Sequence, residues 1–244
     1  MTPIIVIPAR MAASRFPGKP LAPIAGRAMI LRVVDFAKSA NVGPVLVAAG
    51  DEEIFDVVRA DGGDAVMTDP SLSSGTDRVF AGLQAFDPNG DFDTVLNLQG
   101  DAPGIDPAPL QQALSVLENN PDTDIATLAM PANDIADNPN AVKVILANAQ
   151  TPGPSRALYF TRANAPFGDG PSYKHIGLYG FRRRALERFC SLAPSSLEQR
   201  ENLEQLRALE AGMVITAAIC DEGPPSVDTP ADLPTVEALF KQEF

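Results

Sequence analysis

Short apolar runs alternate with amphipathic segments through the first half of the chain. Strands are expected at 3–8, 44–49, 65–68 and 94–98, and helices at 28–40, 51–60 and 76–86. Parallel strands need long crossover connections, which are usually helices. The alternation therefore predicts an α/β fold with a mixed, mostly parallel sheet flanked by helices.

The second half continues this pattern around a region of different composition. Helices are expected at 107–118, 197–211 and 230–240, and strands at 125–129, 175–181 and 214–219. Residues 131–172 are rich in Asn, Pro and Gly, with strands near 142–146 and 157–161. Because this region has too few apolar residues for its own core, we expect one domain over 1–244 with an inserted lobe at about 131–190.

A basic loop follows the first predicted strand, from Pro8 to Pro20, and it carries Arg10, Arg15 and Lys19. The first 34 residues hold five basic side chains and no acidic ones, whereas the rest of the chain holds 14 basic and 31 acidic residues. Cations concentrated at the carboxyl end of a strand predict a site for a polyanion. The alternative is an ordinary solvated loop, which would not need prolines to fix its φ angles.

The overall composition excludes several classes of protein. The formal net charge is −12, which argues against the basic face of a nucleic-acid-binding protein. Cys190 and Cys220 are too far apart for a short metal-binding pair, and we expect both to be reduced thiols. No signal-peptide pattern opens the sequence and no apolar run approaches a membrane span, so we expect a cytoplasmic protein without a membrane partner.

Two common phosphate-binding motifs are missing from the basic loop. A Walker loop needs a glycine at the position of Ala13, and no Gly-x-Gly-x-x-Gly follows the first strand. Phosphate would have to be bound by side chains, for which arginine offers a planar fork and lysine a point charge. Arg10, Arg15 and Lys19 could therefore surround the oxygens of a nucleoside triphosphate.

Two aspartates are candidates for the Mg²⁺ that usually accompanies a triphosphate. Asp101 follows the strand at 94–98, at the edge where open α/β sheets bind ligands, but it could also be a turn residue bonded to its own backbone. Asp228 precedes Thr229 and Pro230, which are typical of an N-cap and a first helical position. Its carboxylate is then free, unless Asp228 caps the helix itself.

Three further polar features have structural as well as functional interpretations. Residues 73–78 could hold a phosphate or a base edge with the amides of a helix start, or could form a plain N-cap. His175 is the only histidine and has no cysteine nearby in the sequence, which argues against a zinc site, and a half-buried strand histidine is the simpler interpretation. Glu198, Glu201 and Glu204 recur at i, i+3 spacing and are expected to form a solvated helix face. Ser195 and Glu198 have the spacing of a capping box.

Eight segments, spread from one end of the chain to the other, carry a resemblance to a known family. They are PARMAASRFPGKPL at 8–21, SGTDR at 74–78, NLQGD at 97–101, NPNAVKV at 138–144, ALYFTR at 157–162, HIGLYG at 175–180, LEQLR at 203–207 and VDTPADL at 227–233. Together they resemble the 3-deoxy-manno-octulosonate (KDO) cytidylyltransferases, also called CMP-KDO synthetases. The first segment is shared by several cytidylyltransferases, whereas the later ones in this order are more specific.

The resemblance implies a reaction and a fold. The family transfers CMP from CTP to the anomeric hydroxyl of KDO, giving CMP-KDO and pyrophosphate for lipopolysaccharide biosynthesis. The resemblance also implies a Rossmann-like nucleotidyltransferase fold, Mg²⁺ as the cofactor, and a homodimer whose interface is built largely by the inserted lobe.

The resemblance further implies roles for individual residues. The CTP ligands would be Arg10, Ser14, Arg15, Lys19, Ser74, Gly75 and Arg78. The Mg²⁺ carboxylates would be Asp101 and Asp228, which with Arg10 and Lys19 would be the catalytic residues. The sugar acid would be bound by Gln99, Arg162, His175, Tyr179, Glu204 and Gln205.

Some positions depart from the family pattern. Ala102 stands where many relatives have a glutamate, and Ser196 and Gln199 stand where relatives often have proline and histidine. Only twelve residues separate Arg162 from His175, fewer than in many relatives. These departures lie near the expected sugar-acid site, so 8-amino-KDO and sialic acid stay as alternative substrates, and a non-catalytic nucleotide-binding module stays as an alternative function.

Overall fold

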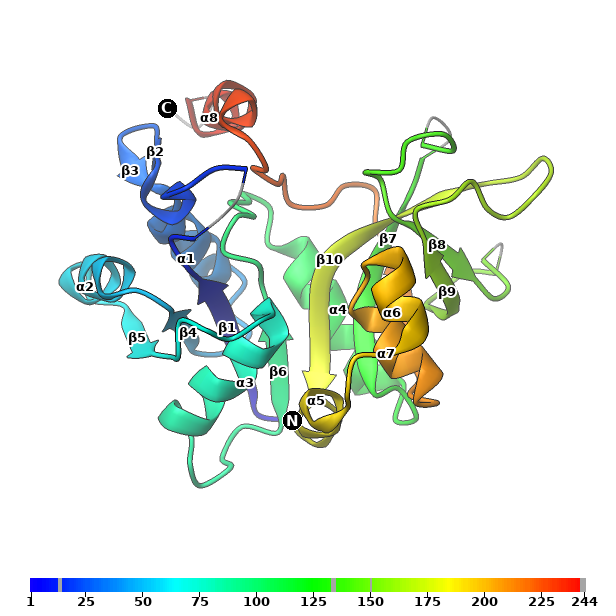
Figure 1. Ribbon diagram of the computed structural model, residues 1–244, viewed down its shortest axis with the longest axis horizontal. Coiled ribbons are helices and arrows are strands. Elements are labelled where there is room, and N and C mark those ends of the chain that lie inside the picture. Colours follow the sequence, from blue (N-terminus) through cyan, green and yellow to red (C-terminus); the bar gives the residue numbers. More distant parts are fainter. Residues whose placement is uncertain (13–14, 133–134, 150, 242–244) are drawn as a thin grey trace. The chain divides into compact units, whose positions relative to one another are not determined.

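The chain divides into two compact units. The structure is a computed structural model that describes residues 1–12, 15–132, 135–149 and 151–241. Unit 1 comprises Met1–Gln111 and Pro224–Phe244, and unit 2 comprises Gln112–Gly223 (Figure 1). The lobe expected at about 131–190 lies within unit 2.

Four parallel strands form the centre of unit 1. In order across the sheet they are β5 (Asp64–Met67), β4 (Val45–Ala49), β1 (Pro3–Ala9) and β6 (Thr94–Asn97). Ile5 of β1 lies opposite Val45 of β4 on one side and Leu96 of β6 on the other. The side chains from Ile4 to Ile7 are fully buried, as expected for a central parallel strand that is covered on both faces.

Three helices connect these strands, and their order sets the position of a ligand site. They are α1 (Met29–Ser39), α2 (Glu52–Ala60) and α3 (Gly75–Phe86). From β1, α1 leads to β4 and α2 leads to β5, whereas α3 leads back past β1 to β6. Because such crossovers are right-handed, α3 covers the opposite face of the sheet from α1 and α2. The strand order therefore reverses between β1 and β6, which is where open α/β sheets bind ligands.

The C-terminal segment returns to unit 1 and packs on the start of the chain. It contains the 3₁₀ turn η2 (Pro230–Asp232) and helix α8 (Leu233–Lys241). The start of the chain contributes the 3₁₀ turn η1 (Lys19–Leu21) and a hairpin of β2 (Pro23–Ile24) and β3 (Arg27–Ala28), which was not predicted. Ile24, Met29, Val227, Val236 and Phe240 form a small buried cluster between these segments.

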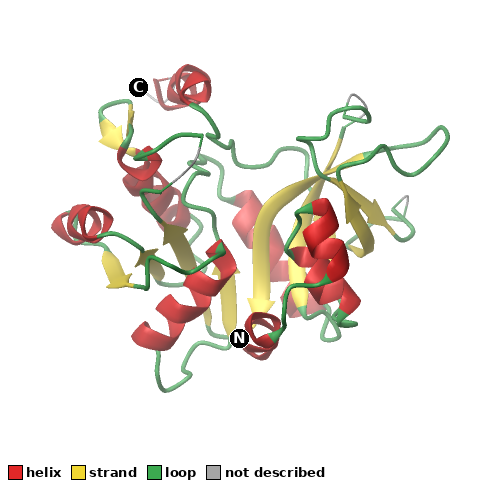
Figure 2. Cartoon of the chain, in the orientation of Figure 1, coloured by secondary structure: helices red, strands yellow, loops and turns green. Residues whose placement is uncertain are grey.

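The five strands of unit 2 pair mostly in antiparallel fashion. In order they are β10 (Tyr173–Arg182), β7 (Ile125–Pro131), β11 (Ile215–Ile219), β9 (Ser155–Thr161) and β8 (Lys143–Leu146). Among the described residues of this unit, only β7 and β11 form a parallel pair. A further pairing of Lys174 in β10 with Lys143 in β8 closes the five strands into a ring. Strand pairing is thus mixed, and the predicted α/β fold is confirmed (Figure 2).

The helices of unit 2 differ from expectation at two places. Helix α4 (Ala108–Asn119) matches the prediction, but α5 (Arg183–Ser191) was not predicted. The single helix expected at 197–211 is wrong, because the chain forms α6 (Ser196–Glu201) and α7 (Gln205–Glu210) instead. Asn202 has a φ of 55° and ends α6 in the left-handed conformation, which asparagine tolerates better than most residues.

Two further expectations concerned the cysteines and membrane-spanning segments. Neither Cys190 nor Cys220 forms a disulfide bond within the described residues, and Cys220 is buried. No helix among the described residues combines the length and apolar character that crossing a membrane requires.

Candidate active site

A cavity of about 760 Å³ opens at the switch point of unit 1. Its walls are formed by the loops after β1 and β6, the start of α3 and the segment before η2. The predicted residues that line it are Arg10, Arg15, Lys19, Ser74, Gly75, Arg78, Gln99, Asp101 and Asp228. Ser14 lies outside the described residues. Residues scattered over more than 200 positions of sequence therefore meet in one cavity.

Lys19 links the two segments that carry the aspartates. Its Nζ donates to Asp101 Oδ2 at 2.6 Å and to the Val227 carbonyl at 2.9 Å. The Val227 amide in turn donates to the Asp101 carbonyl at 3.0 Å. The Lys19 side chain is only 13% exposed, so the ion pair lies in the wall of the cavity. The Asp101 carboxylate faces Lys19, which contradicts its interpretation as a turn residue bonded to its own backbone.

Asp228 pairs with the basic loop as well. Its Oδ1 accepts a hydrogen bond from Arg15 at 2.7 Å, and both side chains are about half exposed or more. Thr229 is the N-cap of η2, so Asp228 is not the capping residue. Asp232 accepts hydrogen bonds from the Asp228 and Thr229 amides at 2.9 and 2.7 Å. The Asp228 carboxylate is therefore held just outside the turn, with its charge directed to Arg15.

Arg10 and Arg78 both line the cavity, and neither makes an ion pair with a carboxylate among the described residues. Arg78 is 2% exposed and donates to Thr68 Oγ1 at 2.6 Å and to the Asp69 carbonyl at 3.2 Å. Burial lowers the pKa of Arg78, and repulsion from Arg10 lowers it further. A methyl group on Gly50 would lie 2.7 Å from the Arg78 guanidinium and 3.2 Å from Arg10 Cβ, so only glycine leaves room for both. This end of the cavity is suited to an anion.

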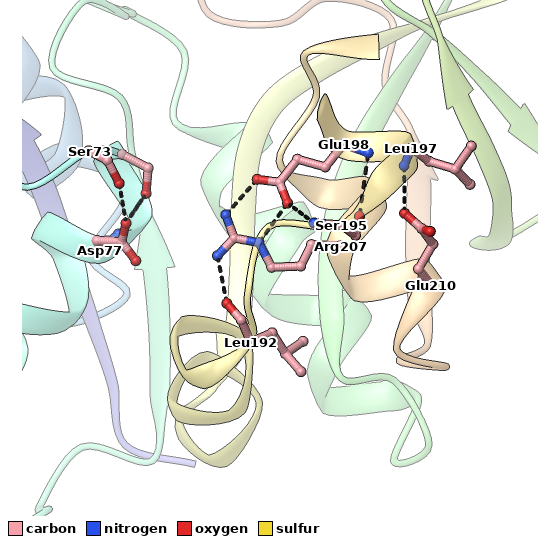
Figure 3. A network of polar contacts seen from close by, with 9 residues as sticks. Ser73, Asp77, Leu192, Ser195, Leu197, Glu198, Arg207 and Glu210 are labelled. Atoms are coloured by element: carbon pink, nitrogen blue, oxygen red, sulfur yellow. Dashed lines mark hydrogen bonds and ion pairs between the residues drawn. The ribbon is translucent and has the colours of Figure 1, made fainter. Parts of the chain in front are cut away.

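The start of α3 forms another wall. Ser74 is its N-cap, and the Ser74 hydroxyl accepts a hydrogen bond from the Asp77 amide at 3.0 Å. The Ser73 hydroxyl also donates to the Asp77 carboxylate, at 3.1 Å (Figure 3). A methyl group on Gly75 would lie 3.4 Å from Gln99 Oε1, which places the helix start next to the loop after β6. The N-cap interpretation is correct, and the same helix start lines the cavity.

The donor set of the cavity suits one kind of metal ion. Asp101 and Asp228 provide two carboxylates in a cavity that also holds several cations. Among the residues that the structure describes, no group of three or more His, Cys, Asp or Glu side chains is gathered to hold a metal. Mg²⁺ is usually bound through one or two carboxylates together with phosphate oxygens and water. These two aspartates could therefore hold Mg²⁺ once a nucleotide supplies oxygens.

Unit 2 brings three of the predicted sugar-acid residues together. The rings of His175 and Tyr179 on β10 are 5.4 Å apart, and Phe160 packs edge-on against His175 at 4.9 Å. Burial lowers the pKa of His175 to about 3. Burial raises the pKa of Tyr179 well above its usual value, and the negative charge of Glu204 raises it further. His175 and Tyr179 are therefore neutral, and Glu204 lies close enough for its charge to be felt.

The other two predicted residues of unit 2 have different surroundings. Gln205 begins α7 and is 5% exposed. The guanidinium of Arg162 donates to the carbonyls of Pro139 and Glu201, at 3.0 Å each. Arg162 is thus fixed by backbone oxygens, and no recorded contact joins it to His175 within the described residues.

The glutamates of α6 do not form the solvated face that was expected. Glu198 and Arg207 make a bidentate ion pair, at 2.8 and 2.5 Å, with side chains 13% and 9% exposed (Figure 3). Glu201 accepts from Thr161 Oγ1 at 2.8 Å and from the Arg162 amide at 2.9 Å. The capping box of Ser195 and Glu198 is confirmed. The break at Asn202 turns these carboxylates toward internal partners.

Thr127 is a residue that the sequence analysis missed. It lies in the middle of β7, is fully buried, and its hydroxyl is 2.9 Å from His175 Nε2. It is a polar side chain within the otherwise apolar run Ile125–Pro131. Because buried polar groups are nearly always hydrogen-bonded, a lone hydroxyl in a buried strand indicates a buried polar partner nearby.

Comparison with known proteins identifies the family. A family model described as cytidylyltransferase matches residues 4–215. The 3-deoxy-manno-octulosonate cytidylyltransferase of Rhodospirillum centenum is 54% identical over 240 residues, which cover 98% of this chain and 93% of the relative. That of Chelativorans sp. is 53% identical over 245 residues, which cover 98% and 97%. The chain belongs to the 3-deoxy-manno-octulosonate cytidylyltransferase family.

Solved structures agree with this family membership. A CMP:2-keto-3-deoxy-manno-octonic acid synthetase complexed with CTP matches with a TM-score of 0.91 and 38% identity, over the whole of both chains. A cytidylyltransferase from Leptospira borgpetersenii matches with a TM-score of 0.67 over 99% of this chain and 87% of the other. At 15% identity, the second match shows a shared fold alone.

Two of the positions that depart from the family pattern have structural roles here. Ala102 is buried, and its amide donates to the Gln99 carbonyl at 3.1 Å. Ser196 begins α6, and its hydroxyl donates to Glu210 at 3.0 Å. Glu210 also accepts from the Leu197 amide at 2.9 Å (Figure 3). In this member of the family, a carboxylate from α7 therefore fixes the start of α6.

Proposed function

We propose that the chain transfers CMP from CTP to the anomeric hydroxyl of KDO, with release of pyrophosphate. The observation that carries the proposal is a cavity in unit 1, which gathers four basic side chains and two carboxylates at a switch point. The family membership supports the choice of CTP and KDO, because relatives at 53 and 54% identity carry that activity in their names.

The chemistry requires positioning and charge neutralisation more than a covalent nucleophile. The anomeric oxygen of the sugar acid forms a bond to the α-phosphorus, and the bond from that phosphorus to the bridging oxygen of the β-phosphate breaks. Phosphoryl transfers of this kind depend on alignment and on stabilisation of charge. Arg10, Arg15 and Lys19 would bind the triphosphate, and Arg78 with the start of α3 would line the cytidine end.

The two carboxylates of the cavity fit a role as Mg²⁺ ligands. Asp101 and Asp228 would hold the ion together with phosphate oxygens, while Lys19 and Arg15 would move from the carboxylates to the phosphates. Bound Mg²⁺ supplies charge neutralisation on phosphate oxygens and lowers the pKa of a coordinated hydroxyl. The ion pairs with Arg15 and Lys19 thus hold both carboxylates beside the cavity, in place for the metal.

The sugar acid would be bound by side chains of unit 2. His175, Tyr179 and Glu204 form a neutral pair of rings beside a carboxylate, which suits a polyhydroxylated ligand. Gln205 and Arg162 complete the proposed set in this unit. Arg162 would pair with the carboxylate of the acid if its guanidinium left the backbone carbonyls that it contacts here.

We also propose that the protein is a homodimer. Two large apolar side chains of unit 2, Leu158 on β9 and Phe167, are 54% and 106% exposed, which favours a partner surface there. The mass in solution, measured by light scattering, should be twice the 25.8 kDa of one chain. A mass of one chain at micromolar concentration would contradict this proposal.

Two further proposals concern the cellular setting. The product would serve lipopolysaccharide biosynthesis, and the enzyme would act in the cytoplasm. Depletion of the protein should then deplete full-length lipopolysaccharide, and fractionation should recover the protein with cytoplasmic enzymes. Normal lipopolysaccharide after depletion would contradict the first proposal.

Pyrophosphate release with a panel of sugar acids tests the proposed function. CTP is supplied with KDO, 8-amino-KDO, a sialic acid or no acid, and the nucleotide product is identified by mass spectrometry. We expect release with KDO and a product of the mass of CMP-KDO. If turnover is faster with 8-amino-KDO or with sialic acid, that acid is the substrate in place of KDO. If no acid supports pyrophosphate release, the chain is better described as a non-catalytic nucleotide-binding module.

A further inference from the structure

The side chain of Thr127 fills a bulge in strand β10. Two extra residues of β10, Gly177 and Leu178, interrupt its pairing with β7, where Ile176 lies opposite Leu128 and Tyr179 lies opposite Thr127. The Thr127 hydroxyl is 3.2 Å from the Ile176 carbonyl and 2.9 Å from the Leu178 carbonyl. A bulge leaves backbone groups without ladder partners, and here the hydroxyl proton serves these carbonyls.

The same hydroxyl also faces His175, and this fixes the proton on the imidazole. Thr127 Oγ1 is 2.9 Å from His175 Nε2. A hydroxyl has one proton to donate and lone pairs to accept. Because the carbonyls can only accept, a Thr127 proton directed to either of them leaves the imidazole as the donor, from Nε2, to Thr127 Oγ1. The neutral ring is then the tautomer with hydrogen on Nε2 and a bare lone pair on Nδ1.

The lone pair on Nδ1 is available to a ligand. No hydrogen bond to Nδ1 is recorded from any residue that the structure describes. Among those residues, the only buried side-chain nitrogen or oxygen without a partner is Gln112 Oε1, so Nδ1 is open rather than enclosed. Burial keeps the pKa of His175 near 3, so the lone pair is not lost to protonation near neutral pH.

We infer that Thr127 is a positioning residue, which holds His175 as the Nε2–H tautomer so that Nδ1 accepts a hydrogen bond from a hydroxyl of the sugar acid. The nature of the ligand rests on the proposed function, whereas the tautomer does not. The Phe160 and Tyr179 rings flank the imidazole and restrict its rotation, so the direction of the lone pair is fixed as well. Thr127 acts only through His175.

The tautomer can be measured directly, because His175 is the only histidine in the chain. A long-range proton–nitrogen correlation spectrum of the full chain, expressed without a histidine tag, distinguishes a protonated ring nitrogen from a bare one. We expect Nε2 to carry the proton and Nδ1 to be bare. A spectrum with the proton on Nδ1, or with both nitrogens protonated near neutral pH, would overturn the inference without any variant or substrate.

Variants separate the hydroxyl from the shape of the side chain. Thr127→Val removes the hydroxyl at constant volume, and we expect a mixture of tautomers, while Thr127→Ser keeps the hydroxyl and should restore the wild-type spectrum. The matched control is Thr123→Val, which removes another buried threonine hydroxyl of unit 2, paired with Thr216 at 2.7 Å. A wild-type spectrum in Thr127→Val would show that Thr127 does not set the tautomer.

Ligand binding gives the second arm of the test. KDO is added to the wild type in the presence of CTP and EDTA, and the Nδ1 signal should move while the Nε2 signal changes little. In steady-state assays, Thr127→Val should raise the KM for KDO about five- to tenfold and leave the KM for CTP unchanged, as expected for one lost hydrogen bond. Thr123→Val should change neither KM.

The spectrum and the assays together distinguish a failure of the role of Thr127 from a failure of the proposed function. If KDO supports no turnover but the spectrum shows Nε2–H, the proposed substrate fails and the tautomer assignment survives. If turnover is normal but saturating KDO leaves the Nδ1 signal unmoved, the proposed function survives and the inference is overturned.

Discussion

Each of the two aspartates of the cavity has a basic partner. Lys19 and Asp101 are joined at 2.6 Å, and Arg15 and Asp228 at 2.7 Å. A bound triphosphate offers these cations a competing partner of higher charge. The ion pairs offset two of the four basic charges that line the cavity, so a net positive charge remains for the nucleotide.

Neutralising either aspartate should affect CTP binding and kcat differently. Asp101→Asn and Asp228→Asn should lower kcat by roughly 100-fold or more, because each removes a proposed metal ligand. The Kd for CTP in the absence of metal should stay the same or fall, since Lys19 or Arg15 loses its competing carboxylate. Calorimetry and a pyrophosphate assay measure the two effects. The matched control is Asp56→Asn, an exposed acid on α2, and a kcat for Asp101→Asn equal to that control would contradict the assignment.

His175 makes the stability of the protein depend on pH. Burial lowers its pKa from 6.5 to about 3, so in the folded state the ring stays neutral at pH 5, while in the unfolded chain it takes up a proton. The unfolded state then binds more protons, and stability falls as the pH drops below 6.5. The loss between pH 7 and pH 5 is about 2 kcal/mol for this one group.

The contribution of His175 can be isolated by substitution. Urea unfolding at pH 7 and pH 5 should show a larger loss of stability in the wild type than in His175→Gln, by about 2 kcal/mol, because glutamine has no proton to bind. Comparison of the two pH values cancels the cost of the substitution itself. Equal losses in the two proteins would show that the imidazole is protonated in the folded state.

At the scale of elements, an ion pair joins α6 and α7. Glu198 lies in α6 and Arg207 in α7, and the two helices are separated by the turn at Asn202. Burial raises the pKa of Glu198, but hydrogen bonds from Arg207 and from the Ser195 amide lower it by more. The carboxylate is therefore ionised above its usual pKa of 4.5, and the stability it contributes is lost as the pH falls below that value.

Breaking this pair should cost more than breaking a surface pair. Glu198→Gln leaves Arg207 without its counter-charge in a largely buried setting, and should lower the free energy of unfolding by about 2–3 kcal/mol. Glu187→Gln is the matched control, because Glu187 pairs with Arg183 within α5 and is 50% exposed, so it should cost at most about 0.5 kcal/mol. Equal urea midpoints for the two variants would contradict a role for the pair in stability.

The elements that could be predicted are those with a strong local signal. Strands β1, β4 and β6 are apolar runs that are buried on both faces, and they can be located to within a residue or two. The hairpin of β2 and β3 could not be, because strands of two residues have no periodicity. The division of the helix expected at 197–211 depends on the φ angle of Asn202, which tertiary contacts such as the pair of Glu198 and Arg207 determine.

At the scale of the whole molecule, the strand order decides which residues form the cavity. Arg10, Arg15 and Lys19 could be predicted from their position after β1, and Asp101 from its position after β6. The burial of Arg78 and the link from Lys19 to the segment before Asp228 could not, because they depend on packing between segments far apart in sequence. Thr127 was missed for the same reason, since its partner lies 48 positions further along the chain.

The charges of the chain are unevenly distributed along the sequence. Five basic residues and no acidic ones occupy the first 34 positions, in a chain whose net charge is −12. A cavity lined by this segment can attract a triphosphate although the protein as a whole repels anions. This local concentration of cations is what makes an acidic protein suited to a nucleotide substrate.

We expect CTP and KDO to react on this chain in a step that requires Mg²⁺, and one assay tests this most directly. Pyrophosphate and CMP-KDO are measured in the same reaction, with CTP, KDO and Mg²⁺ each left out in turn. We expect equal amounts of the two products when all three are present, and neither product when any one is missing. Pyrophosphate released from CTP without KDO, or no CMP-KDO in the complete mixture, would contradict the account.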